Sequence, residues 1–461
     1  MKRWNLPVKI NEIYDIEIEN LSSNGQGIGR IDGYTLFVEG ALPNERVRVE
    51  ITKTNKNYGF AKLLQVVEKS PARVSPICEH FGECGGCQLQ HMDYSSQLEF
   101  KTQTVKDALT RIGKLTDIEV LPTIGMGFPT RYRNKAQLPV GMDDEGAILG
   151  FFCRRSHDIV DMNTCLIQVT ANDEIGAIIR NFIDKYNVSV YDENTHRGII
   201  RHIVTKVGFS TGEILVVIVT NGDSLPHKED LVDMLQEKIE GIVGIVQNIN
   251  NRKTNVILGK DNVVLWGRDH IIDTIGEYKF RISPLSFFQV NSVQTEVLYG
   301  KALTYAKLSG EETVFDVYCG IGTISLFLAK YAKKVYGIEI VEDAVEDAKK
   351  NAKLNGIENV EFIAGEAERI VPDLMSRAIR PDVVVLDPPR KGCDRGLLEV
   401  IAKAEPSRIV YVSCNPATLA RDLGYLKEYG YVAHEAQPVD MFPYTNHVEC
   451  VIEIQKVQSS K

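Results

Sequence analysis

The sequence predicts a multidomain chain with a small β-barrel at the N-terminus, a mixed α/β domain in the middle and an α/β domain with a parallel sheet at the C-terminus. Three patterns support this division. Short alternating strands fill residues 1–68, an apolar strand leads into a Gly-x-Gly turn from Val314, and a buried strand stops at Cys414. With 461 residues, 44% of them hydrophobic, the chain can build about two or three domains with ample cores.

The N-terminal unit, residues 1–68, has the pattern of an all-β barrel. Apolar and polar residues alternate as they do in strands with one buried face. The alternating segments are 14–19, 35–39, 46–51 and 61–67. Glycines cluster in the connection 24–29, which we interpret as a turn.

The middle region, residues 69–281, combines a helix pattern over 94–112 with strand patterns around 135–140 and 214–220. A polar loop containing Gly and Pro follows at 221–226. We interpret the region as a mixed α/β domain of antiparallel character. Its pattern alone indicates no function.

Three cysteines gather at the start of this region. Cys78, Cys84 and Cys87 follow a C-x5-C-x2-C spacing with glycines between them, which allows a tight loop whose sulfurs point at one centre. The spacing is compatible with core cysteines or with a zinc site, and three thiolates need a fourth ligand. Because no signal peptide and no apolar run of ~18 residues is evident, we expect a cytoplasmic protein without disulfides and without a membrane partner.

The C-terminal domain, residues 282–461, contains a nucleotide-binding pattern. Gly320 and Gly322 form a turn before a helix, so backbone N–H groups can face a ligand. Glu339 ends the next strand, 19 residues after Gly320, where a carboxylate can bind ribose hydroxyls. Ser325 occupies the place of the third glycine in a dinucleotide fingerprint, which argues against NAD and for another adenosine ligand, S-adenosylmethionine.

A cysteine at a strand-to-helix corner is the second feature of this domain. The buried strand 409–412 ends before Cys414, and Pro416 separates it from a helix pattern. Open α/β sheets place their chemistry at the carboxyl ends of parallel strands. Cys414 is therefore either a small buried hydrophobe or a nucleophile, and the Asp387-Pro-Pro-Arg390 strand end favours the nucleophile.

Five motifs of this domain occur in the order of a known family. Residues 282–461 resemble the catalytic domain of the bacterial RNA (uracil-5-)-methyltransferases, which implies a Rossmann-like class I methyltransferase domain. The matching motifs are Phe287-Phe-Gln289-Val-Asn291, Asp316-Val-Tyr-Cys-Gly320, Asp387-Pro-Pro-Arg390, Ser413-Cys-Asn-Pro-Ala-Thr-Leu-Ala-Arg-Asp422 and His447-Val-Glu449-Cys-Val451. Residues 1–68 resemble a TRAM domain, an OB-like RNA-binding barrel, through Gly25-x-Gly27 and the segment 37–43.

The resemblance implies a role for particular residues. Cys414 corresponds to the nucleophile and Glu449 to the base. Glu366 replaces the Asp or Asn that relatives often carry, and position 323 also varies among them. The cofactor contacts implied by the resemblance are Gln289, Tyr318, Thr323, Glu339, Glu366 and Asp387.

The cysteine loop also resembles a feature of this family. Similar 23S rRNA methyltransferases carry a [4Fe–4S] cluster with this spacing, and their fourth cysteine lies in a segment like 161–167. The resemblance therefore implies Cys165, rather than Cys153, as the fourth ligand beside Cys78, Cys84 and Cys87. Glu79 stands where relatives usually have proline. Methyl transfer consumes no electrons, so we expect the cluster to be structural.

The chemistry of uracil fits these residues independently. Carbon 5 is a poor nucleophile until a thiolate adds to carbon 6, and a base must then remove the carbon-5 proton so that the thiolate can leave. A free thiol near pKa ~8.5 is mostly neutral, so the site must favour the thiolate. We expect the helix N-terminus after Pro416, together with Arg421, to contribute.

The charge of the chain is acidic overall and basic locally. A net charge of −9 and a pI near 5.6 argue against a general nucleic-acid binder. Seven basic residues nevertheless fall between 46 and 73, and the segment 131–135 places Tyr132 inside a basic stretch suited to splayed bases. The RNA contacts that we predict are Phe287, Arg131, Arg133, Lys53 and Lys56.

We therefore predict a monomeric enzyme that methylates carbon 5 of uracil in 23S rRNA. Three other functions are compared with this prediction. An RNA cytosine-5 methyltransferase would carry a cysteine where this chain has Arg390, and Cys393 is displaced from that position. An iron–sulfur redox protein would leave the Cys414 and Glu449 motifs unexplained. We expect tRNA-specific relatives to lack both the barrel and the cysteine loop, which favours 23S rRNA over tRNA.

Overall fold

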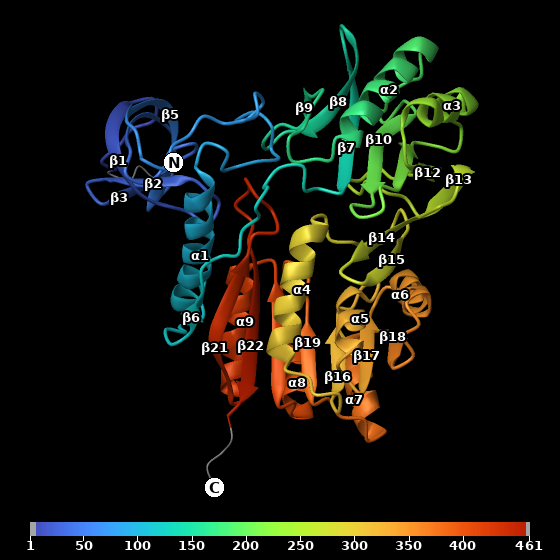
Figure 1. Ribbon diagram of the computed structural model, residues 1–461. Helices are drawn as coiled ribbons and strands as arrows, with labels where there is room; N and C mark the ends of the chain where they lie inside the picture. The colour runs from blue at the N-terminus through green and yellow to red at the C-terminus, as the bar shows by residue number, and fades with distance from the viewer. Residues whose placement is uncertain (1–5, 458–461) are drawn as a thin grey trace.

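The computed structural model describes residues 6–457, which form a barrel, a central α/β unit and a C-terminal α/β unit (Figure 1). The barrel is closed, with the strand order β1-β2-β3-β5-β4. Its strands are β1 (Ile13–Leu21), β2 (Gly27–Ile31), β3 (Tyr34–Val38), β4 (Arg46–Thr54) and β5 (Tyr58–Glu68). None of the helices within the described range has the length and apolar character needed to cross a bilayer.

One prediction about the barrel was wrong. The segment 24–29, which we interpreted as a turn, is a turn only at its start, and Gly27 and Gly29 belong to strand β2. A side chain at Gly29 would place its Cβ 2.7 Å from the backbone oxygen of Glu17 on β1. The glycines therefore allow β1 and β2 to approach closely, which their sequence signature alone does not distinguish from turn formation.

The central unit is a sheet with the order β13-β12-β11-β10-β7-β8-β9, in which only β11 and β12 pair in parallel among the described strands. Helices α2 and α3 cover one face with an apolar core. The elements are β7 (Lys135–Asp143), β8 (Gly146–Phe152), β9 (Ile159–Asp161), α2 (Ala171–Tyr186), β10 (Ile200–Val207), β11 (Ile214–Thr220), α3 (Lys228–Lys238), β12 (Ile242–Ile249) and β13 (Asp261–Gly267).

The C-terminal unit is a sheet with the order β18-β17-β16-β19-β20-β22-β21-β6. The strands from β18 to β20 are parallel, whereas β22 is antiparallel to both of its neighbours. The strands are β16 (Thr313–Val317), β17 (Lys334–Glu339), β18 (Val360–Ala364), β19 (Val383–Leu386), β20 (Arg408–Ser413), β21 (Tyr431–Val439) and β22 (Glu449–Lys456). The hairpin β14 (Ile271–Ile275) and β15 (Tyr278–Ile282) joins this unit to the central one.

Helices cover both faces of this sheet, as expected for a Rossmann-like domain. Alternate residues of each strand enter two separate cores: Val314 packs in one and Phe315 in the other. The first core contains α4 (Ser292–Ala306), α5 (Thr323–Ala329) and α6 (Glu342–Leu354). The second contains α7 (Ala367–Ser376), α8 (Arg395–Ala404) and α9 (Pro416–Glu428).

A segment from the first third of the chain completes the C-terminal unit. Helix α1 (Tyr94–Arg111) packs in the second core, and the two-residue strand β6 (Glu119–Val120) pairs with β21 at the sheet edge. The segment that contains α1 and β6 therefore precedes the central unit in the sequence but packs with the C-terminal unit. The domain boundaries that we placed at 68 and 281 stay predictions.

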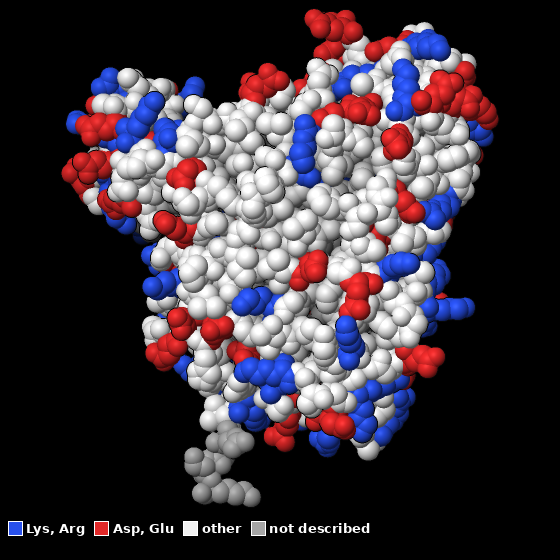
Figure 2. All heavy atoms as spheres, viewed as in Figure 1, with Lys and Arg blue, Asp and Glu red and all other residues white. Residues whose placement is uncertain are grey.

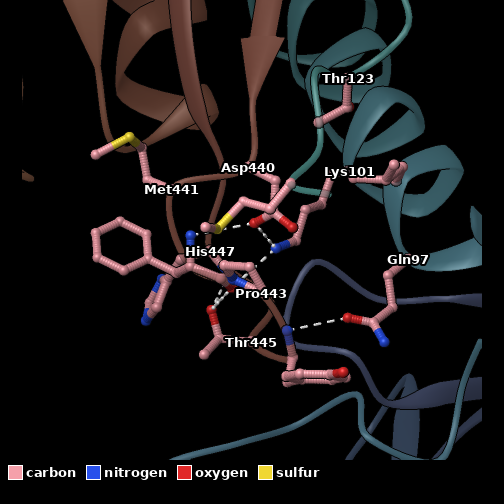
Figure 3. A network of polar contacts seen from close by, with 12 residues as sticks. Gln97, Lys101, Thr123, Asp440, Met441, Pro443, Thr445 and His447 are labelled. Atoms are coloured by element: carbon pink, nitrogen blue, oxygen red, sulfur yellow. Dashed lines mark hydrogen bonds and ion pairs between the residues drawn. The ribbon is translucent and has the colours of Figure 1, made fainter. Parts of the chain in front are cut away.

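The loop between β21 and β22, residues 440–448, is held from several sides (Figure 3). Lys101 on α1 and Asp440 are both fully buried, and the Lys101 Nζ lies 2.5 Å from an Asp440 carboxylate oxygen and 3.0 Å from the Phe442 carbonyl oxygen. The Tyr94 hydroxyl donates to the other Asp440 oxygen at 2.9 Å. Burial lowers the pKa of Lys101, while Asp440 opposes that shift.

Removing one partner of this buried pair should destabilise the protein strongly. We expect Asp440→Asn to lose about 3–5 kcal/mol, because the charge of Lys101 would stay buried without its counterion. Urea denaturation followed by far-UV circular dichroism would measure the shift in midpoint. Glu346→Gln, which removes an exposed pair with Lys349, is the control and should leave the midpoint almost unchanged. Equal shifts in the two variants would contradict the role of the pair.

Candidate active site

A cavity of about 870 Å³ opens at the carboxyl ends of the parallel strands. It lies where β16, β17, β19 and β20 end and where β22 begins, which is the usual ligand site of an open α/β sheet. All the predicted catalytic and cofactor residues line this one cavity: Cys414, Glu449, Gln289, Tyr318, Thr323, Glu339, Glu366 and Asp387.

The turn after β16 shapes one end of the cavity. Gly320 and Gly322 have φ angles of +54° and +83°, and a Cβ at Gly322 would lie 2.7 Å from the Phe362 ring, so only glycine fits there. The Gly320 N–H donates to the Glu339 carboxylate at 3.2 Å. This turn leads directly into α5, whose first residue, Thr323, shares a hydrogen bond of 3.0 Å with the Tyr299 hydroxyl.

Strand register brings Cys414 and Glu449 together. Strands β20 and β22 are antiparallel with Ser413 opposite Cys450, so the next position of each strand places Cys414 opposite Glu449. Cys414 immediately precedes Asn415, the N-cap of α9, whose side chain accepts the Ala417 N–H.

The corner at Cys414 is also tied to the strand end at Asp387. The side-chain amide of Asn415 donates to the Arg390 carbonyl oxygen at 3.0 Å, and the Thr418 hydroxyl donates to the same oxygen at 3.4 Å. The two motifs that the sequence separates by more than twenty residues therefore form one rigid wall of the cavity.

Two carboxyl groups, those of the buried Glu449 and the half-buried Asp387, dominate the electrostatics of the site. Burial, and then the neighbouring Asp387, raise the pKa of Glu449 to about 8. Burial, and then Asp316, raise the pKa of Asp387 to about 7. Neither carboxyl group has a side-chain hydrogen-bond or ion-pair partner within residues 6–457. Both are therefore available to a ligand in the cavity.

The surroundings of Cys414 favour the neutral thiol over the thiolate. Burial raises its pKa to about 12, and the charges of Glu449 and Asp387 act in the same direction. Arg390 opposes them, and it also lines the cavity. The sequence motif contained Arg390, but its position relative to Cys414 depends on how β19 and β20 pair.

Our expectation for Arg421 was wrong. Its guanidinium lies against the Asp422 carboxylate and donates to the carbonyl oxygens of Lys391 and Cys393 at 3.0 and 3.1 Å. It therefore braces the connection after β19 and does not act on Cys414. The cation that lowers the pKa of the thiol is Arg390.

A second cavity, of about 290 Å³, lies next to the first. Cys78, Cys84, Cys87 and Cys165 line it, whereas Cys153 does not. Arg390, Phe442 and His447 line both cavities and separate them. Within the described part of the chain, no three or more His, Cys, Asp or Glu side chains are grouped as a single metal ion requires.

The predicted RNA contacts differ in their surroundings. Phe287 is 66% exposed and lines the active-site cavity, and Lys53 and Lys56 are exposed on the barrel. Arg133 lines the cysteine cavity. Arg131 is occupied by an ion pair with Asp173 at 2.9 Å and by hydrogen bonds to two carbonyl oxygens.

The aromatic residue of the 131–135 segment cannot receive a base. Tyr132 is only 1% exposed and its hydroxyl donates to the Pro443 carbonyl oxygen at 3.0 Å, so our expectation of stacking was wrong. The basic stretch from 46 to 73 is also partly neutralised, because Arg46, Arg48 and Arg73 pair with acidic residues. Figure 2 shows Lys and Arg mixed with Asp and Glu around the edge of one face, and few charges at its centre.

Comparisons with known proteins agree with this geometry. Residues 93–457 match the model of the tRNA (uracil-5-)-methyltransferase family, and residues 7–64 match that of the TRAM domain. An uncharacterised RNA methyltransferase of Clostridium tetani is 55% identical over 447 residues, which is 97% of each chain. Another, from Halalkalibacterium halodurans, is 51% identical over 455 residues and covers 99% of each chain.

A solved structure is similar over nearly the whole chain. It is the Pyrococcus abyssi tRNA (uracil-54, C5)-methyltransferase in complex with S-adenosyl-L-homocysteine, 29% identical with a TM-score of 0.77, covering 96% of this chain and 100% of that one. A tRNA methyltransferase therefore matches the barrel as well, and our expectation that such relatives lack it was wrong. The chain belongs to the tRNA (uracil-5-)-methyltransferase family of RNA methyltransferases and carries a TRAM domain.

Proposed function

We propose that the protein methylates carbon 5 of uridine in 23S rRNA with S-adenosylmethionine as methyl donor, through a covalent bond between Cys414 and carbon 6. The observation that carries this proposal is the pairing of a cysteine and a buried carboxyl group across strands β20 and β22, inside one cavity. A cytosine-5 methyltransferase would need a cysteine at position 390, where this chain has Arg390. The displaced Cys393 is buried and does not line this cavity, so it does not support that alternative.

The cavity suits S-adenosylmethionine. Glycine at 320 and 322 lets the backbone approach a ligand, Glu339 lies at the end of β17 where it can accept from ribose hydroxyls, and the volume accommodates both a nucleoside and a flipped uracil. When bound, the sulfonium supplies an electrophilic methyl group. The Pyrococcus relative was solved with the demethylated product of such a donor.

Cys414 acts first in the proposed mechanism. Its thiolate adds to carbon 6 of uracil, and carbon 5 gains the electron pair that attacks the methyl group. The N-terminus of α9 and the guanidinium of Arg390 are the groups of this chain that favour the thiolate. They have to outweigh the burial that keeps the thiol neutral in the free protein.

Glu449 acts last. Its carboxylate removes the proton from carbon 5, the double bond re-forms, and the Cys414 thiolate leaves. The raised pKa makes Glu449 a stronger base than an ordinary carboxylate, which suits the removal of a proton from carbon. Asp387, which raises that pKa, contributes to the cofactor and base pocket.

The RNA substrate has two candidates. The resemblance of the cysteine loop to that of 23S rRNA methyltransferases supports rRNA. The likeness to the Pyrococcus tRNA methyltransferase over 96% of this chain supports uracil-5 methylation of tRNA as the second candidate.

Transcripts that contain 5-fluorouridine should separate these candidates and test the nucleophile. Fluorine cannot leave carbon 5 as a proton does, so the adduct with Cys414 should persist on a denaturing gel. We expect an adduct with 23S rRNA transcripts, none with tRNA transcripts, and none with Cys414→Ala, whereas Cys153→Ser should react like the wild type. Adduct with tRNA alone would assign the second candidate, and adduct in Cys414→Ala would overturn the mechanism.

Glu449→Gln should stop the reaction after methyl transfer. The amide cannot accept the carbon-5 proton, so methylated RNA should stay attached to Cys414 as a slow band that carries label from the methyl donor. Turnover should fall by about two to four orders of magnitude, as expected for loss of a general base.

The pH profile provides the control for this variant. A base must be deprotonated, so the rate at which the wild type releases methylated RNA from the Cys414 adduct should fall about tenfold per unit as pH drops below the Glu449 pKa of about 8. Near wild-type turnover in Glu449→Gln, without a trapped band, would show that another group takes the proton.

We also propose that Cys78, Cys84, Cys87 and Cys165 hold a [4Fe–4S] cluster of structural role. The support for this proposal is that the four side chains line one cavity, which Cys153 does not line. Burial raises the pKa of Cys84 to about 11 and of Cys87 to about 12, so metal binding would have to displace their protons.

Protein purified without oxygen should be brown and contain about four irons per chain. Cys165→Ser should bleach the absorbance because it removes a ligand, whereas Cys153→Ser should retain it because Cys153 lies outside the cavity. Iron content and visible absorbance measure both effects. Stoichiometric zinc in place of iron would refute the cluster and leave the catalytic proposal intact.

A further inference from the structure

A third hollow, of about 680 Å³, lies in the central unit and has no part in the proposed chemistry. It is formed by β7, β8 and β10 together with the loops near 191–196 and 253–255. His202 lies on β10 opposite Pro139 of β7, on the sheet face away from α2 and α3. We call this hollow the β10 pocket.

The imidazole of His202 has no partner. The residue is only 6% exposed, its Nδ1 is buried without a hydrogen bond, and the ring makes no hydrogen bond or ion pair with any residue that the structure describes. Burial lowers its pKa to about 4, so the ring is neutral and offers one donor and one acceptor. A buried polar group is normally satisfied, and this one faces a cavity where a ligand can satisfy it.

The neighbouring wall is rigid. The Arg201 guanidinium donates to the carbonyl oxygens of Asn250 and Arg252 at 2.7 and 2.8 Å, and it lies 4.2 Å from the centre of the Tyr191 ring. The Tyr191 hydroxyl in turn shares a hydrogen bond of 2.8 Å with His196. These contacts form the pocket before a ligand arrives. The Tyr191 ring and the Arg201 guanidinium line it beside the imidazole of His202.

The charge of the pocket selects the kind of ligand. Three carboxylates, those of Asp158, Asp192 and Glu193, line it against two cations, Arg201 and Lys253. Arg201 is already occupied by carbonyl oxygens and by an ion pair with Glu193 at 3.8 Å. A phosphate would find no surplus positive charge here. Carboxylates and a neutral imidazole suit the edge of a base that carries an exocyclic amino group, as adenine, cytosine and guanine do and uracil does not.

On the same face of the sheet as the β10 pocket, strand β10 also contacts the segment that leads to the active-site cavity. Four residues along β10 from His202, Lys206 donates to the carbonyl oxygens of Ser283 and Ser286 at 2.6 and 2.7 Å. Phe287, the next residue, lines the active-site cavity. The strand rise places His202 about 13 Å from Lys206, within reach of a nucleotide near the target in the same RNA.

We propose that the β10 pocket binds one unpaired, amino-bearing nucleobase that flanks the target uridine, with His202 reading its edge. This inference rests on the proposed function, because it takes the RNA substrate from it. The pocket then determines specificity at a position that the active site does not touch.

A pool of RNA oligonucleotides with a central 5-fluorouridine and randomised flanks provides the test. Sequencing the RNA recovered in denaturation-resistant adducts should reveal a preference of about tenfold for adenine, cytosine or guanine over uracil at one flanking position of the wild type. His202→Ala should lose that preference and keep adduct formation. Glu193→Gln is a second variant, at a side chain that is 44% exposed and forms an ion pair with Arg201 at 3.8 Å. His227→Ala, at the start of α3, is the matched control and should keep the preference.

The outcomes separate the pocket from the catalytic proposal. An unchanged preference in both His202→Ala and Glu193→Gln would overturn the pocket while adducts still support the function. If the wild type forms no adduct, the catalytic proposal fails, and non-covalent retention of the same pool on filters then decides the pocket. Base preferences that differ between wild type and His202→Ala in that assay would support it, and identical preferences would overturn it.

Discussion

Lys101 and Asp440 meet in the interior although 339 residues separate them in the sequence, and their contact joins helix α1 to the loop between β21 and β22. Two charges without water are stable only when their other hydrogen bonds are also satisfied. Here Tyr94 and the backbone of Phe442 complete the set. The loop carries Phe442 and His447 into the cavity walls and leads directly into Glu449.

The same loop connects all three parts of the protein. Gln88 and Leu89, just after the cysteine loop, donate their backbone N–H groups to the Tyr444 carbonyl oxygen at 2.9 Å. Tyr132, at the start of the central unit, donates to Pro443, and Asn446 donates to Ser23 of the barrel. A rearrangement of the cysteine loop would therefore be transmitted to residues that flank Glu449. This gives a physical reason for a structural element to lie beside a site that needs no electrons.

The fold also determines the pKa values in the active site, because it brings several carboxyl groups together. The parallel strands end at one edge, so Asp387 and Asp316 are close to each other, and the antiparallel strand β22 adds Glu449 to the same region. Carboxyl groups that are buried together cannot all ionise, which raises their pKa values. A carboxylate with a raised pKa is a stronger base, which suits the role proposed for Glu449. Arg390, in the turn after β19, is a cation that lowers the pKa of Cys414 against this trend.

By itself the sequence determined the local elements and the chemical identity of the site. Alternation predicted most barrel strands, periodicity predicted α1, and glycines, proline and carboxylates at strand ends marked the residues that now line one cavity. These features depend on contacts between residues that are close in the sequence. Such contacts can be predicted from the spacing of apolar residues and from the residue types at turns. Motif order then indicated the family, because each motif carries one part of a single reaction.

Only the tertiary structure decided which groups meet. Three features depend on contacts between segments far apart in the sequence. Arg390 rather than Arg421 acts on the pKa of Cys414, Tyr132 is buried, and His202 Nδ1 has no hydrogen-bond partner among residues 6–457. The two-residue strand β6 is too short to show a period, yet it completes a sheet edge. Burial and pairing of this kind result from long-range packing, and no local pattern of residues records them.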